Sequence, residues 1–306
     1  MPQNHTILLL IQVVVPLSLV LWFTVKKIES QLELILDIIL TVSVIGFIIV
    51  AGRWDIFSIY FQYILILIYA IAFFYRIRIF NELDFFPDGT VLGWFITLFK
   101  IIIIGAFALL NYQLYEALQP DANGITINAP FDKGEFYVTD GGSNKLLNNN
   151  VKSKSQKNAI NLVKLSLLGG HAKTLNPENL SDFEIYKDTV FSPVDGQIIK
   201  VVDNIPNRTS GNSLKSHPLG NYIVIQYTNC LLVLSNLQPH SSLVNKNMFI
   251  TSGEPIAQVG ASGDFHEPLL HIFAVKTTNI DSMKSQSGIP IFFNNTFPVK
   301  NTTLHF

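Results

Sequence analysis

A single histidine stands in an apolar run near the end of the chain. His271 lies within EPLLHIF, residues 267–273. An imidazole can bind a metal or transfer a proton, but a hydrolytic zinc ion needs three nitrogen or oxygen ligands and an open position for water. Further ligands for such chemistry would therefore have to come from other parts of the fold.

Other histidines in the same half of the chain include His171, His217, His240 and His266. They form no metal-binding spacing motif, and His266 would point to the opposite face from His271 if both lay on one strand. We therefore expect these four histidines to be solvated loop residues. Residues 171–187 are polar and lack a strong pattern, which predicts a flexible insertion.

Short apolar runs that could position these residues begin after a turn-rich linker at residue 119. Runs bounded by Gly, Pro, Asn or Asp predict strands. They lie at residues 136–138, 190–191, 197–202, 222–226, 231–234, 256–259 and 270–275. Residues 158–168 are ambiguous, because they are apolar without a decisive period. The pattern favours an all-β sandwich or barrel over residues 119–306.

The first 118 residues have a different composition. Four segments are nearly free of charge, and each is long enough to cross ~30 Å of hydrocarbon as a helix. They lie at residues 7–24, 34–50, 56–75 and from 94 or 101 to 114. We expect residues 1–118 to form a four-helix transmembrane domain. The first segment has no basic start, so we expect a retained span rather than a cleaved signal peptide.

The basic residues of the short connections predict the orientation in the membrane. Lys26 and Lys27 follow the first span, and Arg76 and Arg78 follow the third, whereas the second connection has Arg53 alone. Cytoplasmic connections are enriched in lysine and arginine. With four spans, both termini and the domain after residue 119 are then extracytoplasmic.

Two charged residues fall inside the apolar segments. Asp37 is expected to be an interfacial carboxylate, and Lys100 is expected to reach back to the cytoplasmic interface. No intramembrane cluster of Asp, Glu, His and Arg is apparent, which argues against a transporter. Cys230 is the single cysteine, so an intrachain disulfide is excluded, and no nucleic-acid partner is expected.

Several short motifs in the second half resemble those of the lysostaphin-type (LytM-like) zinc metalloendopeptidase family in order and spacing. They are GGSN (141–144), QKNAIN (156–161), FSPVDGQI (191–198), GNYIVI (220–225), LQP (237–239), SGEPI (252–256), VGASG (259–263) and EPLLH (267–271). The resemblance covers residues 131–275. It implies a LytM-like β domain with a duplicated hybrid motif, which is also similar to biotinyl and lipoyl carrier domains, and it leaves the four spans unexplained.

The positions that carry zinc ligands and the general base in this family mostly hold other residue types here. The resemblance places these positions at Asn149 or Asn150, Asn161, Asn236, Leu269 and His271, which we call the vestigial cleft residues. A neutral amide is a weak zinc donor and cannot take a proton near neutral pH, and leucine can do neither. Since only His271 keeps the residue of the family, we expect a degenerate member that binds no metal and is not an enzyme.

The resemblance therefore implies a pseudoenzyme in the bacterial inner (cytoplasmic) membrane, with its β domain in the periplasm or outside the cell. We expect the domain to bind an envelope protein partner, a peptide or a peptidoglycan peptide in the vestigial cleft, and to act in assembly or regulation of an envelope complex. No cofactor is expected. One alternative is an active zinc endopeptidase with a rearranged ligand set, the case in which zinc would bind. Another is that the four helices carry the function within a larger membrane complex.

Overall fold

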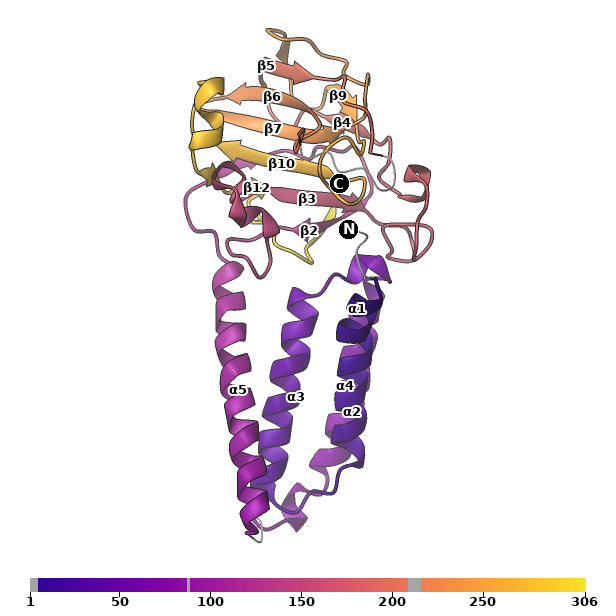
Figure 1. Ribbon diagram of the computed structural model, residues 1–306, viewed down its shortest axis with the longest axis vertical. Helices are drawn as coiled ribbons and strands as arrows, with labels where there is room; N and C mark the ends of the chain where they lie inside the picture. The colour runs from indigo at the N-terminus through magenta and orange to yellow at the C-terminus, as the bar shows by residue number, and fades with distance from the viewer. Residues whose placement is uncertain (1–4, 87–88, 209–215) are drawn as a thin grey trace. The chain divides into compact units, whose positions relative to one another are not determined.

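The computed structural model describes residues 5–86, 89–208 and 216–306. The chain divides into two compact units, one helical and one containing the β strands (Figure 1). In the described residues, the helical unit extends to Trp54 and resumes over Ile59–Tyr115, and the β unit comprises Asp55–Ser58 and Glu116–Phe306. Four apolar helices followed by a mostly β domain is the predicted fold class, and it is confirmed.

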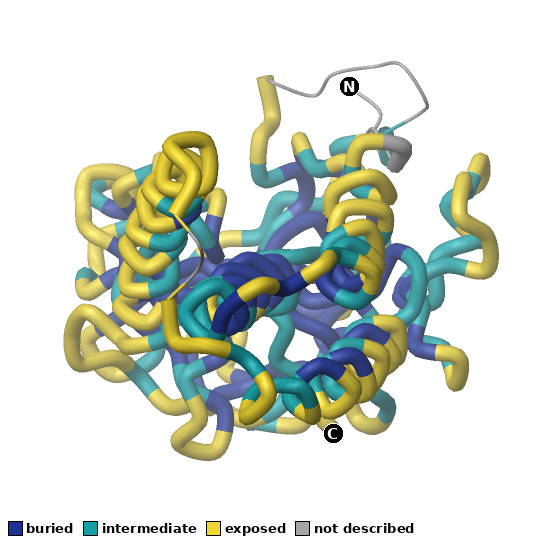
Figure 2. The backbone as a smooth tube through the Cα atoms, turned by 90° about the horizontal axis from the view of Figure 1, so that it is seen from below, coloured by how far each residue is buried: buried dark blue, intermediate teal, exposed yellow. Residues whose placement is uncertain are grey.

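The helical unit contains four helices long and apolar enough to span a membrane, at Ile7–Val25, Gln31–Ala51, Tyr60–Glu82 and Val91–Ala117. The helices are α1 (His5–Leu9), a π-helical turn (Leu10–Val14), α2 (Val15–Val25), α3 (Gln31–Ala51), α4 (Tyr60–Ile77) and α5 (Val91–Ala117). The helix of the third predicted span, α4, begins at Tyr60 rather than at residue 56, because Trp54–Ile56 forms a separate 3-10 turn. Long stretches of the helices are exposed (Figure 2). Their exposed apolar side chains include Leu92 and Phe95, as a lipid-facing surface requires.

A cluster of charges lies inside the helical unit. Asp37 of α3 is 1% exposed and pairs with Lys26 at 2.7 Å and with Lys100 of α5 at 2.6 Å. Glu33 pairs with Lys26 at 2.5 Å. These residues lie far apart in the sequence, at the end of α2, at the start of α3 and within α5, so the sequence pattern does not indicate their convergence. Two cations and two anions balance each other, which reduces the cost of burying them.

The β unit is built on one large antiparallel sheet. Its strands are β1 (Ile125–Ile127), β2 (Glu135–Asp140), β3 (Ile160–Lys164), β4 (Thr189–Phe191), β5 (Gly196–Val202), β6 (Asn221–Tyr227), β7 (Cys230–Leu237), β8 (Phe249–Ile250), β9 (Pro255–Gln258), β10 (Leu270–Val275), β11 (Gly288–Ile289), β12 (Ile291–Phe293) and β13 (Thr303–His305). The large sheet has the order β13-β2-β3-β10-β7-β6-β5-β8, with β11 also paired to β10. Two small sheets, β1-β12 and β4-β9, accompany it.

The main core lies between the large sheet and the two small ones. It combines residues of β10 and β7, such as Ile272 and Leu234, with Phe293 of β12 and Ile256 of β9. A second cluster, which includes Phe273 of β10 and Met283, covers part of the other face of the large sheet. Alternate residues of β10 thus point into different layers, as the period of two in a strand requires. His271 shares the face of Phe273.

The strands predicted from apolar runs are present, and Leu270–Val275 has the predicted bounds. The ambiguous residues 158–168 contain β3 over Ile160–Lys164. The short strands β1, β8, β11, β12 and β13 were not predicted, because runs of two or three residues carry no recognisable period.

Two connections are more ordered than the sequence suggests. The segment Asp55–Ser58 between α3 and α4 belongs to the β unit, where the Ser58 hydroxyl donates to the carbonyl oxygen of Leu168 at 2.7 Å. The predicted flexible insertion at residues 171–187 is instead folded. Ala172 pairs with Phe183, and Ile185 is 1% exposed within the main core.

Candidate functional site

The sheet register brings two of the vestigial cleft residues together. In the pairing of β10 with β3, His271 lies opposite Asn161. In the pairing of β3 with β2, Asn161 lies opposite Asp140, next to a bulge after Val138. Adjacent strands therefore place an imidazole, an amide and a carboxylate in a row.

These three side chains form a hydrogen-bonded chain with a defined direction. Asn161 Nδ2 donates to Asp140 Oδ2 at 3.1 Å, so the amide oxygen Oδ1 faces His271 Nδ1, 2.6 Å away. An amide oxygen accepts only, so Nδ1 carries the proton and Nε2 carries the lone pair. Nε2 is buried without a hydrogen-bond partner among the described residues. Complete burial lowers the pKa of His271 to about 3, so the ring is neutral near pH 7.

Aromatic rings close over His271. The ring of Phe265 lies 4.9 Å from the imidazole and that of Phe273 lies 5.6 Å away, both measured between centroids. Arg208 Nη1 donates to the carbonyl oxygen of Phe265 at 2.8 Å, which holds this loop. His271 is 0% exposed, so the ring offers no open position to a water molecule or a substrate.

The Asn236 side chain forms hydrogen bonds with the backbone, including that of Leu269. Asn236 has a positive φ of 66°, a conformation that asparagine tolerates better than most residues. Its amide donates to the carbonyl oxygen of Leu269 at 2.9 Å and accepts from the backbone N–H of Gly263 at 2.9 Å. Both side chains are buried. The amide at residue 236 therefore links the end of β7 to the loop before β10.

Asn149 and Asn150 lie in a 3-10 turn at Asn149–Lys152. The backbone N–H and the side-chain amide of Asn149 both donate to Asp140 Oδ1 at 3.0 Å. Asn149 is exposed and Asn150 is half-buried, and Asn150 Nδ2 has no hydrogen-bond partner among the described residues. Asp140 thus collects donors from two vestigial cleft residues. Asp140 was not predicted as a site residue, since a lone carboxylate before a glycine pair carries no signal in the sequence.

A zinc ion does not fit this arrangement. His271 is the one imidazole among the vestigial cleft residues, and its Nδ1 is engaged by the amide of Asn161. The Asp140 carboxylate already accepts three N–H bonds from Asn149 and Asn161. Amides are weak zinc donors, and a closed aromatic cover leaves no room for the open position of a hydrolytic site.

An open groove lies on the same face of the large sheet as His271, over β5 and β6. Its volume is about 910 Å³, within the range of ligand-binding pockets. We call it the lysine groove. Its lining residues are Ile199, Lys200, Val201, Asp203, Tyr222, Asn245, Lys246, Ile280, Asp281, Met283 and Lys284. Three lysines and two aspartates give the lining an excess of positive charge, and Lys200 Nζ lies 5.6 Å from the Tyr222 ring.

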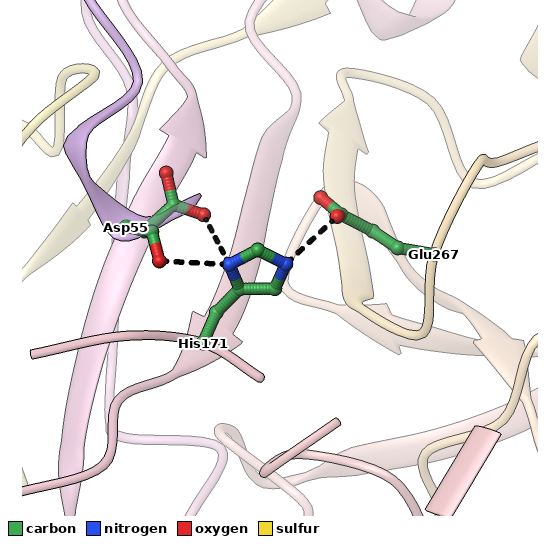
Figure 3. Close-up of side chains that lie close together, drawn as sticks. All are labelled: Asp55, His171 and Glu267. Atoms are coloured by element: carbon green, nitrogen blue, oxygen red, sulfur yellow. Dashed lines mark hydrogen bonds and ion pairs between the residues drawn. The ribbon is translucent and has the colours of Figure 1, made fainter. Parts of the chain in front are cut away.

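A second polar cluster lies elsewhere in the β unit, outside the vestigial cleft residues (Figure 3). His171 Nδ1 lies 3.1 Å from Asp55 Oδ2, and His171 Nε2 lies 3.2 Å from Glu267 Oε2. We call these three residues the buried triad. The exposed fractions of Asp55, His171 and Glu267 are 0%, 4% and 8%. The expectation that His171 is a solvated loop residue is therefore wrong, because the segment Asp55–Ser58 and the loop before β10 cover it.

The fold and the sites together define a protein with four helices long and apolar enough to span a membrane and a mostly antiparallel β domain that contains a closed, amide-rich polar row. No protein-family model and no curated protein matches the chain. Solved structures similar to part of it include a zinc-containing peptidase from Vibrio cholerae, with 21% identity, a TM-score of 0.30 and coverage of 49% of this chain and 37% of that chain.

Two further solved structures similar to part of the chain are also of peptidases. The catalytic domain of the antimicrobial peptidase lysostaphin from Staphylococcus simulans has 14% identity, a TM-score of 0.28 and coverage of 51% of this chain and 88% of that chain. An M23 peptidase from Pseudomonas aeruginosa has 16% identity, a TM-score of 0.23 and coverage of 30% and 35%. The chain thus spans about a third of the Vibrio and Pseudomonas proteins.

Proposed function

We propose that this protein is a membrane-anchored, non-catalytic LytM-like module that binds a peptide in the cell envelope. The peptide would belong to a protein partner or to peptidoglycan, and binding would serve the assembly or regulation of an envelope complex. The observation that carries the proposal is the state of His271. Its ring is neutral, fully buried and bound to the amide of Asn161, so it can neither hold an accessible hydrolytic metal nor reach a substrate.

The lysine groove supports the binding part of the proposal. It is open, has a volume of about 910 Å³ and lies on the sheet face that carries His271. Lys200, Lys246 and Lys284 are exposed and offer charge-assisted hydrogen bonds to a carboxylate. Tyr222 and Met283 provide apolar contact area between them. An extended peptide with a free or side-chain carboxylate is the ligand that this combination suits best.

The location also forms part of the proposal. The segment Asp55–Ser58 between α3 and α4 belongs to the same unit as the chain after α5, so both must lie on one side of the membrane. The basic connections after the first and third spans then lie on the other side, which the positive-inside rule assigns to the cytoplasm. This agreement supports an integral protein of the bacterial cytoplasmic membrane with an extracytoplasmic β unit.

The binding test uses the full chain in detergent micelles. Soluble cross-linked peptides released from bacterial peptidoglycan are titrated calorimetrically, first into the natural protein. The double variant K200E/K284E reverses two charges of the lysine groove and is expected to weaken binding about tenfold, or about 1.4 kcal/mol. The matched control is K145E, an exposed lysine outside the groove. Equal binding by K200E/K284E and the natural protein would exclude the groove as the binding site.

The catalytic test follows cleavage of the same cross-linked peptides with added Zn²⁺. We expect no cleavage. Cleavage that a chelator stops and that His271→Gln abolishes would overturn the non-catalytic assignment. Cleavage that survives His271→Gln but disappears in Glu267→Gln would instead support the alternative, an endopeptidase with a rearranged ligand set.

A further inference from the structure

We propose that the buried triad binds one divalent metal ion, at a site separate from the vestigial cleft residues. Asp55, His171 and Glu267 each offer one ligand atom, and these three atoms lie within 4.8 Å of one another. An imidazole and a carboxylate, here His171 and Glu267, are donors that metal ions use in proteins, and a second carboxylate, here Asp55, can orient the imidazole. The three residues come from three connections of the β unit, so the fold itself brings them together (Figure 3).

The contacts of His171 determine which ring nitrogen faces the metal. Nδ1 lies 2.9 Å from the backbone carbonyl oxygen of Asp55 and 3.1 Å from Asp55 Oδ2. A carbonyl oxygen can accept but not donate, so Nδ1 carries a hydrogen. In the neutral ring, Nε2 then carries a lone pair. That lone pair faces the Glu267 carboxylate.

A cation between Nε2 and the Glu267 carboxylate would remove the repulsion between these two acceptors. Two acceptors facing each other at 3.2 Å repel unless something positive lies between them. A metal with bonds of about 2.0 to 2.2 Å separates neighbouring ligand atoms by roughly 3.0 to 3.5 Å. The distance from Nε2 to Glu267 Oε2 falls within this range, so little movement is needed to admit an ion.

Asp55 completes the site by orienting the ring. A carboxylate or carbonyl that accepts from the second nitrogen of a metal-binding histidine fixes its tautomer and makes the ring a stronger ligand. Asp55 provides both kinds of acceptor to Nδ1. The two carboxylates carry two negative charges, which a divalent ion balances.

The surroundings favour a structural ion. The three side chains are at most 8% exposed, and the peptide N–H of His171 also donates to the Asp55 carbonyl oxygen at 2.9 Å. A peptide substrate has no access to such an enclosed site. Mixed imidazole and carboxylate ligation suits Zn²⁺ or Mn²⁺. We expect the ion to fix the segment Asp55–Ser58 to the loops that carry His171 and Glu267.

The test measures metal bound to the full chain in detergent. The protein is stripped with a chelator, dialysed against micromolar Zn²⁺ or Mn²⁺, and analysed by plasma mass spectrometry. We expect about one ion per chain in the natural protein and in His271→Gln, and less than a tenth of this in Glu267→Gln. Glu254→Gln is the matched control, since Glu254 is an exposed glutamate outside the triad, and it should bind like the natural protein.

The outcomes separate this site from the proposed function. Absence of bound metal in the natural protein would overturn the metal site and leave the non-catalytic assignment intact. In that case a proton rather than a metal ion lies between His171 Nε2 and Glu267. Loss of metal in His271→Gln would overturn both. Circular dichroism in the presence of chelator shows whether Glu267→Gln is folded. If it is not, Asp55→Asn provides the second measurement, with an expected 10- to 100-fold loss of affinity; unchanged affinity would contradict the site.

Discussion

Two histidines of the β unit are buried to nearly the same degree and have opposite surroundings. His271 is 0% exposed and touches the amide of Asn161 and the rings of Phe265 and Phe273. His171 is 4% exposed and lies between the carboxylates of Asp55 and Glu267. The imidazole is thus neutral at residue 271, whereas at residue 171 it lies where two carboxylates stabilise a positive charge.

The difference lies in the partners rather than in burial. At His271 the nearest polar partner is an amide, and burial alone lowers the pKa, because a charged ring has no compensating anion in contact. At His171 two anions stand at the two ring nitrogens. The position that resembles a metal ligand in sequence contacts an amide and aromatic rings, whereas the position without any motif contacts two carboxylates.

The largest effect is expected from His171→Ala, which removes the histidine that lies between two carboxylates. Removing the imidazole leaves two buried carboxylates facing each other, and loss of one member of a buried ionic group costs about 3 to 5 kcal/mol. Thermal unfolding of the full chain in detergent, followed by circular dichroism, measures the loss. His217→Ala changes an exposed histidine and should stay within about 0.5 kcal/mol. Similar results for both variants would contradict the role of the triad.

Asn161→Asp makes the surroundings of His271 resemble those of His171. The new carboxylate replaces the amide that donates to Asp140 Oδ2, so two anions meet near 3.1 Å. We expect a destabilisation of about 3 kcal/mol at pH 8. The matched change Asn179→Asp lies at a helix cap, where both residue types serve equally well. A stable Asn161→Asp variant would show that His271 becomes charged and neutralises the pair.

The pH dependence of stability tests whether His271 is buried in its neutral form. The pKa of His271 is about 3 in the folded chain against an ordinary value of 6.5. The unfolded chain therefore takes up a proton first as the pH falls, and the stability contributed by the neutral ring, complete above pH 6.5, is lost between pH 6.5 and 3. From pH 8 to pH 5 the loss is about 2 kcal/mol.

The His271→Gln variant cannot take up this proton. Between pH 8 and pH 5 its free energy of unfolding should therefore fall about 2 kcal/mol less than that of the natural protein. The measurement is the unfolding midpoint of the full chain across this pH range. His217→Gln should keep the slope of the natural protein. A variant slope equal to the natural one would mean that His271 is not buried in the neutral form.

The smallest effect is expected from Ser58→Ala. It removes the hydroxyl bond to the Leu168 carbonyl oxygen, worth about 1 kcal/mol, without touching the triad. Hydrogen exchange of residues 168–171 should become severalfold faster, while metal binding stays the same. Ser285→Ala, which removes a hydroxyl bond within an exposed 3-10 turn, is the control. Loss of metal in Ser58→Ala would place the hydroxyl among the groups that hold the ion.

Local patterns predicted most of the fold and little of the second site. The bounds of β10 follow from a continuous apolar run, and the long helices follow from length and charge depletion. The buried triad depends on tertiary contacts between residues 96 or more positions apart, such as His171 and Glu267. Asp55 gave no signal, because a carboxylate in a connection between two spans is ordinary. His171 was mispredicted because it lies between a glycine pair and a largely polar segment, a pattern typical of a solvated loop.

The membership of Asp55–Ser58 in the β unit has a consequence for biosynthesis. These residues are translated before α4 and α5, so one part of the β unit is made before those helices and the rest of the unit after them. Folding of the β unit is therefore coupled to the synthesis and folding of α4 and α5, which separate its two parts. A chain that starts after α5 would lack one carboxylate of the triad, and grafting the β unit onto a foreign anchor would require two crossing points rather than one.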